Sequence, residues 1–595
     1  MTRVPRTRTV VIGALSFLVA VFSWLLRFND PGGSFAGLTD DHFFYLVRGW
    51  QILFGDLPVR DFVDHGAPLF YYIAAAVQAL FGRGTLSELT FCATALAVGA
   101  AATFWLSTVA SGSILAGLAG VLIHVWLVPR FYNYPKILVY AAAIPLLWWF
   151  ADRPTVRARS WIAVVTVIGF LFRHDHGVYV AVAMAVLLLF MADVPWKERL
   201  RHFALYAALV TALLLPYFAF IEWNGGVVSY FRQASAWADH DRGRAPVVWP
   251  GLFDNPDGVS EQGQHGSTIG RAVAVLRDNR VAWMYYFEIL LPLFALAVLS
   301  VSSDGFRPTW PRARAKLAMV AVLTLVLDAG FLRSPLEARL ADTSVPLVIL
   351  VAWLLVAVPC MFVQTSSWRD AVQPFRRLVG VASAAVVAAV AVLLTVFISH
   401  DLPRLLDKAA MLDRWGKSFE RASIITERLR QDWSLSSWAA RADRPDLITL
   451  SLYVNACTSP NDRILVEAYM PQVLALARRA FAGGHADLRP GFFETEEAQR
   501  LTLSRLQGQS VPMILLDTDE SLRNFRISFP IIAEYIDQHY RLAATHVFDG
   551  RFGISLFVRR DREPDRTWQP LGWPCYGSGA PAVQVGPNVE ARRDG

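Results

Sequence analysis

Charged residues are scarce in this sequence, at 18% of 595 residues, whereas ordinary soluble proteins carry about 25%. The shortage is uneven, because Asp, Glu, Lys and Arg make up about 14% of residues 1–399 and about 26% of the rest. Apolar residues reach 54%, and the mean hydropathy is +0.37. These values exclude a disordered chain, a coiled coil and a single compact soluble domain. They predict a multi-spanning membrane domain over 1–398 and a soluble domain over 399–595.

Cysteine is also scarce, with four residues. Cys92 and Cys360 lie in apolar runs and are most simply small core residues. Cys457 and Cys575 lie in the polar tail, where they could pair if the tail is extracytoplasmic, although spacing alone cannot show it. The absence of a CxxC motif or a His/Cys cluster argues against a structural zinc site.

Apolar runs, in contrast, are abundant, and a run of about 20 residues can cross a bilayer. The first run starts after three arginines, has no cleavage site after it and is interpreted as a retained anchor. The clear runs are 10–27, 88–109, 112–128, 203–222, 281–300, 316–332, 344–363 and 378–398, and the shorter ones are 67–81, 136–150, 160–172 and 177–191.

Loop charges assign the sides of the membrane. The N-terminus and four loops are rich in Lys and Arg, which predicts that they are cytoplasmic: 151–160, 192–202, 301–316 and 364–377. Segment 28–66 has six Asp and two Arg, so we place it outside, together with 223–280, 333–343 and the tail. The number of crossings between 28–66 and 151–160 must then be odd. We therefore expect about 11 full crossings, with the Pro68-initiated run at 67–81 as a partial helix.

The outer segment 28–66 combines acidic residues with an apolar stripe. Asp40 and Asp41 precede a stripe over 43–53 at helical spacing, which predicts an amphipathic helix able to lie in the membrane interface. Arg60, Asp61, Asp64 and His65 follow a Gly-Asp-Leu-Pro turn. Such a surface suits a lipid-linked substrate with a reactive head group; the alternative is a plain solvated acidic loop.

The segment resembles a known family. Asp41 and Tyr45 fit the Asp-x-x-x-Tyr pattern that follows the first span in the GT-C superfamily of membrane glycosyltransferases, which includes protein O-mannosyltransferases and lipid A aminoarabinose transferases. Its continuation through Arg48-Gly49-Trp50 to His65-Gly66-x-Pro68 is similar to the bacterial branch, and the likeness is strongest over about 28–130. His42 stands where the family usually has Glu, which puts a metal or sugar contact of that residue in doubt.

The resemblance implies a GT-C-like polytopic α-helical membrane protein, with about 11–12 transmembrane helices and a C-terminal extracytoplasmic α/β domain. It implies an inverting transfer of a sugar from a polyprenyl-phosphate donor to a glycan, lipid or protein acceptor, in the bacterial inner membrane. Asp41 would be the general base, with Asp40 as the substitute. The residues expected to orient the substrates are Tyr45, Asp61, Asp64, His65 and Asp175.

The leaving phosphate requires cations on the outer face. Arg173 and His174 lie in an expected outer turn between short spans, and their position resembles the place where aminoarabinose transferases present a phosphate-binding Lys. Arg333 and Arg339, oriented by Glu337 and Asp342, offer a second place, and Arg60 a third. Each of these also has a structural interpretation, as a loop at the water boundary or an internal salt-bridge cluster. The segment 129–136 is either an aromatic anchor or a wall of the sugar site.

Neither a cofactor nor a nucleic-acid partner is indicated, because the surplus of positive charge lies in the membrane part and fits the positive-inside rule. A divalent metal stays open, with His174, His176 and His240 as weak candidates. The expected partners are the lipid-linked sugar, the acceptor and membrane lipid.

The tail alternates strand-like and helical runs, which predicts a small α/β layer. Gly483-Gly484 is interpreted as a helix C-cap. The expected strands are 463–467, 511–517 and 552–558, and the expected helices are 471–482, 495–507 and 530–539.

Two other functions share the same substrates. A transporter or flippase of lipid-linked glycans would usually show charges inside spans and repeated halves. The spans hold few charges apart from Asp328, and no repeat is evident in the sequence. A polymerase of surface polysaccharide would lack the early Asp-x-x-x-Tyr segment.

Overall fold

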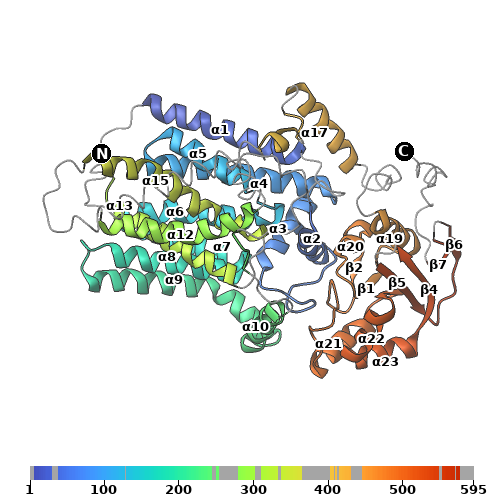
Figure 1. The fold of residues 1–595 in the computed structure, drawn as a ribbon. Helices are drawn as coiled ribbons and strands as arrows, with labels where there is room; N and C mark the ends of the chain where they lie inside the picture. The colour runs from blue at the N-terminus through green and yellow to red at the C-terminus, as the bar shows by residue number, and fades with distance from the viewer. Residues whose placement is uncertain are drawn as a thin grey trace. The chain divides into compact units, whose positions relative to one another are not determined.

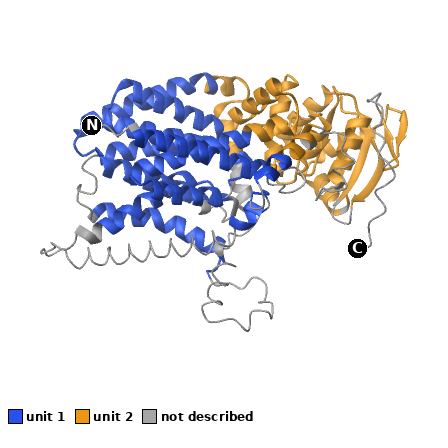
Figure 2. Cartoon of the chain, turned by 90° about the horizontal axis from the view of Figure 1, so that it is seen from above, with its two compact units in different colours: residues 1–30, 92–217, 244–421 blue, residues 31–91, 218–243, 422–595 orange. Residues whose placement is uncertain are grey.

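The computed structural model describes most of the chain, and its contacts divide the chain into two compact units (Figures 1 and 2). Unit 1 comprises 1–30, 92–217 and 244–421, and unit 2 comprises 31–91, 218–243 and 422–595. The described residues are 6–29, 38–127, 129–243, 249–252, 279–301, 310–332, 337–364, 402–407, 409–411, 415–430, 445–548, 552–569 and 571–576.

Unit 1 is built from helices that lie side by side, and three helices, α4, α9 and α17, pass from one unit to the other (Figures 1 and 2). Its elements are α1 (Arg6–Asn29), α4 (Thr85–Ser111), α5 (Ile114–Trp126), η1 (Phe131–Asn133), α6 (Tyr134–Asp152), α7 (Val156–Phe172), α8 (His174–Phe190), α9 (Trp196–Trp223), α12 (Arg280–Val301), α13 (Ala313–Asp328), η4 (Ala329–Leu332), α14 (Glu337–Leu340), α15 (Ser344–Gln364) and α17 (Trp415–Arg430).

The apolar runs of the sequence correspond to these helices and to α3 (Pro68–Phe81) of unit 2; the run at 378–398 lies outside the described residues. Within the described part of the chain, five helices are long and apolar enough to cross a membrane, namely α1, α4, α9, α12 and the stretch Phe131–Asp152. The 14 residues of α3 rise about 21 Å, less than the ~30 Å of a hydrocarbon core. Helix length does not test the expected partial crossing, because α5, which we expect to cross fully, has 13 residues.

In unit 1, loops that were assigned to the same side of the membrane from their charges contact one another. At the end expected to be cytoplasmic, Lys316 binds Asp152 with 2.6 Å between Nζ and Oδ1, and Arg312 binds Asp193 with 2.9 Å between Nε and Oδ2. At the opposite end, Lys136 donates to both carboxylate oxygens of Asp342 at 2.6 Å. The grouping of loops follows the expected sides, although the orientation in a membrane stays a prediction.

Unit 2 joins the outer segment after α1 to the tail of the chain, which sequence reasoning placed in separate domains. Its helices are α2 (Asp40–Leu53), α3, α10 (Val227–Gly243), α19 (Pro445–Cys457), α20 (Pro471–Ala477), α21 (Glu496–Gln507), α22 (Asp519–Ser528) and α23 (Pro530–His539). Its strands are β1 (Arg463–Val466), β2 (Ala480–Phe481), β3 (Met513–Asp517), β4 (Tyr540–Phe548), β5 (Phe552–Arg559), β6 (Arg566–Trp568) and β7 (Trp573–Cys575).

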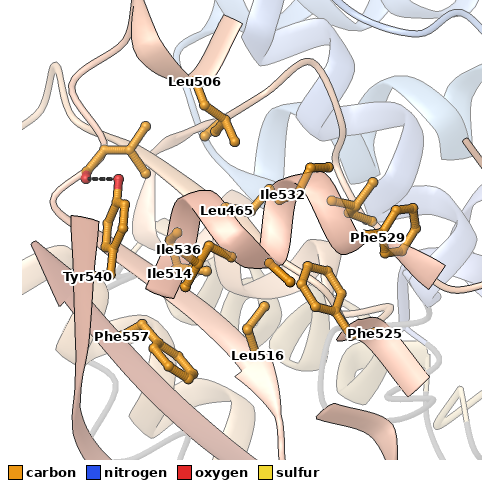
Figure 3. Packing of buried hydrophobic residues seen from close by; sticks show 14 residues of the cluster. Leu465, Leu506, Ile514, Leu516, Phe525, Phe529, Ile532, Ile536, Tyr540 and Phe557 are labelled. Atoms are coloured by element: carbon orange, nitrogen blue, oxygen red, sulfur yellow. Dashed lines mark hydrogen bonds between the residues drawn. The ribbon is translucent and has the colours of Figure 1, made fainter. Parts of the chain in front are cut away.

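The main sheet of unit 2 has the order β2-β1-β3-β5-β4, in which β2, β1 and β3 are parallel and β5 is antiparallel to both of its neighbours. One face packs against α21, α22 and α23 through a fully apolar core, which Figure 3 shows around Leu465, Ile514 and Leu516. The alternate residues Ile464 and Leu515 are buried too. Because successive side chains of a strand point to opposite faces, the central strands are covered on both faces.

The expected strands of the tail match β1, β3 and β5, and the helices expected near 495–507 and 530–539 match α21 and α23. The helix expected over 471–482 ends at Ala477, and residues 480–481 form β2. The C-cap interpretation of Gly483-Gly484 is therefore wrong. These glycines have φ of +67° and +84°, and a Cβ on Gly484 would lie 2.9 Å from the carbonyl oxygen of Asp61. Gly484 thus permits the outer segment to approach the tail closely.

The outer segment does form the expected helix, α2, but its apolar stripe does not face lipid. Phe43, Leu46, Val47 and Trp50 are buried within unit 2. Helices α3 and α20 pack on α2, and a Cβ on Gly49 would lie 2.8 Å from that of Ala74. The stripe is therefore explained by packing within the protein rather than by the membrane interface.

The two cysteines of the tail form a disulfide, Cys457–Cys575, which ties α19 to β7. Cys92 is a buried free thiol, whereas Cys360 is an exposed free thiol, so the interpretation as a core residue holds for Cys92 and is wrong for Cys360.

Candidate functional site

The two candidate base residues, Asp40 and Asp41, form the first turn of α2, where the helix dipole favours negative charge. Both side chains are exposed, and each is held by a neutral donor from the tail within unit 2. The phenol of Tyr469 donates to Oδ1 of Asp41 at 2.8 Å, and the amide of Gln472 donates to Asp40. Asp41 is therefore positioned without an opposing cation in these contacts.

Tyr469 is itself fixed on two sides. Its ring lies 5.8 Å from that of Phe44, and the guanidinium of Arg489 lies 4.5 Å from its centroid. Arg489 in turn pairs with Asp487, with 2.7 Å between Nε and Oδ2. Burial, followed by the charge of Asp41, raises the pKa of Tyr469. The side chain thus stays a protonated phenol at neutral pH and keeps its role as donor.

This cluster lies where parallel strands end. Tyr469 follows β1, and Asp487 and Arg489 follow β2; the N–H of Leu488 donates to the carbonyl of Val466 at 3.2 Å. In open α/β sheets, ligands bind outside the carboxyl ends of the parallel strands. Sequence reasoning missed Tyr469, Gln472, Asp487 and Arg489, although the end of the expected strand 463–467 was a signal for the first of them.

Asp61 and Asp64 hold the shape of the outer segment. Oδ2 of Asp61 accepts from the Leu57 N–H at 2.8 Å and from Arg60 at 2.6 Å. Burial alone would raise the pKa of Asp61, but the hydrogen bonds from Arg60 and Leu57 bring it below its usual value. Asp64 is buried and accepts from the N–H groups of Gly66 and Ala67 and, at 2.8 Å, from the hydroxyl of Tyr230.

His65 and Tyr45 lie among aromatic side chains. The ring of His65 lies 5.1 Å from Phe44 and 6.3 Å from Phe493, and Tyr45 stacks on Phe70 at 4.3 Å. Burial, with the charge of Arg48 second, lowers the pKa of His65 well below its usual value, so the imidazole is neutral. His65 is connected to Asp41 only indirectly, through ring contacts of Phe44 with His65 and with Tyr469.

His42, the departure from the family pattern, is fully buried. Its Nε2 lies 3.0 Å from Oε1 of Glu88, and the other carboxylate oxygen of Glu88 accepts from Gln78 at 3.2 Å. His42 thus points into the packing of α2, α3 and the start of α4, away from the exposed side of Asp41. The pair of His42 and Glu88 offers one nitrogen and one carboxylate to a metal, but both groups are already hydrogen-bonded to protein.

The expected donor cations belong to unit 1, except Arg60, which belongs to unit 2. Arg173 lies between α7 and α8, and its Nε donates to Oδ1 of Asp175 at 2.7 Å. Lys136, at the start of α6, pairs with Asp342. Arg173 and Asp175 lie close enough to Lys136 for their charges to act on it. We call these two cations and two carboxylates the basic-acidic cluster. The pairing of Lys136 does not test whether the segment 129–136 is an aromatic anchor or a wall of the sugar site.

The other predicted cations lie in separate contacts. Arg339 donates to the carbonyl of Gly330 in η4 at 2.7 Å. Arg333 lies outside the described residues. Arg60 is exposed and pairs with its neighbour Asp61. His174 lies 3.3 Å from the hydroxyl of Tyr217, whereas His176 is buried with its Nδ1 2.7 Å from the hydroxyl of Tyr140. These contacts explain both histidines by hydrogen bonds, which was the alternative to a metal site. His240 lies in α10, and the structure describes no contacts of its side chain.

Comparisons with known proteins add a likeness of fold. No family model matches the sequence, and no curated protein does. Nine chains of solved structures match, among them ArnT from Cupriavidus metallidurans in the apo state. The likeness to ArnT covers 92% of this chain and 98% of that chain, with 12% sequence identity and a TM-score of 0.42. At that identity and TM-score, the roles of individual residues have to be argued from this chain itself.

Proposed function

We propose that this protein is a GT-C-type membrane glycosyltransferase that moves a sugar from a polyprenyl-phosphate donor to an extracytoplasmic acceptor. The observation that carries the proposal is the way Asp41 is held. A neutral phenol fixes Oδ1, so the carboxylate keeps its negative charge and Oδ2 can accept a proton. A general base for a bulky acceptor needs an oxygen that is oriented and accessible, and Oδ2 of the exposed Asp41 is proposed to be that oxygen.

In the proposed reaction, Asp41 takes the proton of an acceptor hydroxyl as that oxygen attacks the anomeric carbon of the donor. The new carbon–oxygen bond forms on the face opposite the phosphate, and the bond to the phosphate oxygen breaks. The phosphate leaves as an anion that needs little protonation, so one carboxylate suffices. In-line attack inverts the anomeric centre.

Two observations support an extracytoplasmic site. First, α2 and the tail belong to one compact unit, and they therefore lie on the same side of a membrane. Second, the Cys457–Cys575 disulfide suits an oxidising compartment such as a bacterial periplasm. Together with the acidic composition of 28–66, they support a tail outside the bacterial inner membrane and a cytoplasmic N-terminus.

The basic-acidic cluster is the proposed binding place of the donor phosphate. Arg173 presents a planar fork that matches phosphate oxygens, and Lys136 adds a point charge. Fixed cations at a boundary of low dielectric stabilise a leaving anion without reorganisation at the moment of reaction. Asp175 and Asp342 hold both cations in place before the donor binds.

The tail is the proposed acceptor side of the site. Its Tyr469, Asp487 and Arg489 stand beside Asp41 and combine an aromatic ring with planar polar groups. Aromatic faces with adjacent carboxylate and guanidinium groups suit a hydroxyl-rich acceptor such as a glycan.

The deciding experiment compares Asp41→Asn with the wild type in lipid nanodiscs, using a panel of polyprenyl-phosphate sugars and candidate acceptors. The amide keeps the hydrogen bond to Tyr469 but cannot take a proton, so turnover should fall about 100- to 10,000-fold. Asp40→Asn is the matched control one residue away, and it should keep most of the activity. Equal loss in both variants, or near-normal turnover of Asp41→Asn, would place the base elsewhere. Movement of the donor lipid without any product would identify the transporter alternative.

A further inference from the structure

Two carboxylates are buried between helices of unit 1 and lie outside the contacts used above. Glu288 in α12 has no exposed surface, and Asp328 at the end of α13 is 5% exposed. The hydroxyl of Thr343 donates to Oε2 of Glu288 at 2.7 Å. Oε1 of Glu288 and both carboxylate oxygens of Asp328 have no hydrogen-bond partner among the described residues.

The two acids belong to one place in the fold. Helices α12, α13 and α15 pack on one another, and Thr343 directly precedes α15. The charges of Asp328 and Asp342 both act on Glu288. Lys136 is the cation paired with Asp342, so these contacts supply no cation to Glu288 or Asp328.

Such an arrangement needs a positive partner. A carboxylate without a donor in an apolar surrounding is costly, and ionisable groups inside membrane helices usually mark a pathway or a bound ion. Carboxylate and hydroxyl oxygens are the donors that Ca²⁺, Mg²⁺ and Mn²⁺ prefer. A divalent ion would neutralise the two acids together, and the competing arrangement is one proton on each acid.

We propose that Glu288, Asp328 and Thr343 bind a divalent cation of this oxygen-preferring class. The ion joins α12, α13 and the start of α15, directly next to the residue that pairs with Lys136. Its role is to fix the start of α15 on α12 and α13, next to Asp342 of the basic-acidic cluster. The site is independent of the base chemistry at Asp41, and it would exist whatever the protein transfers.

The test uses the full-length protein in nanodiscs, stripped with a chelator and then titrated with Ca²⁺, Mg²⁺ or Mn²⁺. We expect a single tightly retained equivalent of at least one of these ions, and a rise in melting temperature on its return. Asp328→Asn and Glu288→Gln should weaken binding at least tenfold. Glu198→Gln, which removes an exposed acid of α9, is the matched control and should bind like the wild type.

A second measurement does not depend on the folding of a variant. Dicyclohexylcarbodiimide modifies buried carboxyl groups in their protonated form, so mass spectrometry of the wild type should find Glu288 or Asp328 labelled in stripped protein and protected by the cation. Labelling that is unaffected by any of the three ions, together with no retained metal, would overturn the proposal and show that protons neutralise the pair. Binding of equal strength in the wild type and in both acid variants would also overturn it.

Discussion

The two sets of groups proposed to meet the substrates, one in each unit, hold their charges in different ways. In unit 2, the carboxylate of Asp41 accepts from a neutral phenol. In unit 1, the guanidinium of Arg173 is bound by the carboxylate of Asp175, and Lys136 by that of Asp342. The base therefore keeps its full charge, whereas each cation is already paired with an anion.

This difference indicates how Asp41 would respond to the acceptor and how the cations would respond to the donor phosphate. A base has to be ready before the acceptor arrives, and a neutral donor orients it without stabilising its charge strongly. Cations near the membrane are costly to leave without counterions, so the carboxylates satisfy them until a phosphate takes over. The phosphate has to compete with Asp175 and Asp342, and donor binding should depend on how well it does so.

The largest effect on the use of the donor is expected from Arg173→Ala. Loss of hydrogen bonds to a charged phosphate should lower kcat/KM for the donor about 10- to 100-fold, with little change in the KM of the acceptor. Arg173→Lys should restore only part of this activity, because the planar fork is lost. Steady-state kinetics with each substrate varied in turn measures both.

The matched control is Arg312→Ala, which removes a similar arginine–aspartate pair at the opposite end of unit 1. It should leave the donor kinetics of the folded protein unchanged. If both variants lose donor use equally, the pair of Arg173 and Asp175 is structural, and the contrast between the two sets of groups does not hold.

A smaller loss is expected from Tyr469→Phe. The phenylalanine keeps the ring contacts with Phe44 and Arg489 but removes the donor to Asp41. Because water can replace the phenol at this exposed carboxylate, kcat should fall only about 3- to 10-fold. The KM of the donor should not move. A change in donor KM instead of kcat would separate Tyr469 from the base.

Removal of the charge of Asp175, the counterion of Arg173, should improve donor binding rather than weaken it. Asp175→Asn keeps the shape of the side chain but loses its charge, and Arg173 then meets the phosphate without a competing anion. Because this pair is partly exposed, the gain is small, with the KM of the donor about two- to fivefold lower. The effect should shrink at high ionic strength. An increase in KM would mean that Asp175 positions Arg173 more than it competes.

The last expectation concerns stability rather than turnover. Burial raises the pKa of Glu467 from 4.5 to about 7, and burial, followed by the charges of Arg505 and Arg48, lowers that of His485 from 6.5 to about 3. The folded state thus binds an extra proton at Glu467 between pH 4.5 and 7, so stability falls as pH rises through this window. His485 acts oppositely: its stability contribution is lost as pH falls from 6.5 toward 3.

The two slopes oppose each other between about pH 4.5 and 6.5. In Glu467→Gln, the slopes of His485 and His65 are no longer opposed by Glu467, so the unfolding stability of unit 2 should rise with pH more steeply than in the wild type, by up to about 1.4 kcal/mol per pH unit across that window. Chemical denaturation followed by the fluorescence of the tail tryptophans, at several pH values, measures this. An identical pH profile in the variant and the wild type would show that Glu467 is ionised in the folded protein.

Local patterns predicted much of the fold. The apolar runs became helices because each run is long enough to decide its own structure, and β1, β3 and β5 were visible as buried runs. Strand β4 was missed because it lies at the sheet edge, where exposed polar residues such as Arg541 and Thr545 interrupt the apolar pattern. The two-residue β2 is too short to leave a pattern.

Only some residues of the proposed site could be predicted from the sequence, for a different reason. Asp41 and Arg173 stood out because an acidic or basic group beside an apolar run is itself a signal. The partners of Asp41 come from 428 residues further along the chain, and no local pattern marks which tyrosine of the tail would reach it. The roles of Asp61 and Asp64 also depend on their contacts, since only the structure shows the backbone N–H groups that they satisfy.

The side chain of Gln51 has a consequence for the synthesis of the protein. Its amide pairs with both the N–H and the carbonyl of Phe481, and so completes the edge strand β2 with a residue made 430 positions earlier. At about 5–20 residues per second, a ribosome needs roughly 20–90 s to add those residues. During this interval the early segment waits without its partner, and a released tail would expose an open strand edge. Assembly of unit 2 therefore falls at the end of translation, and a chaperone that protects the open strand edge would have to act before then.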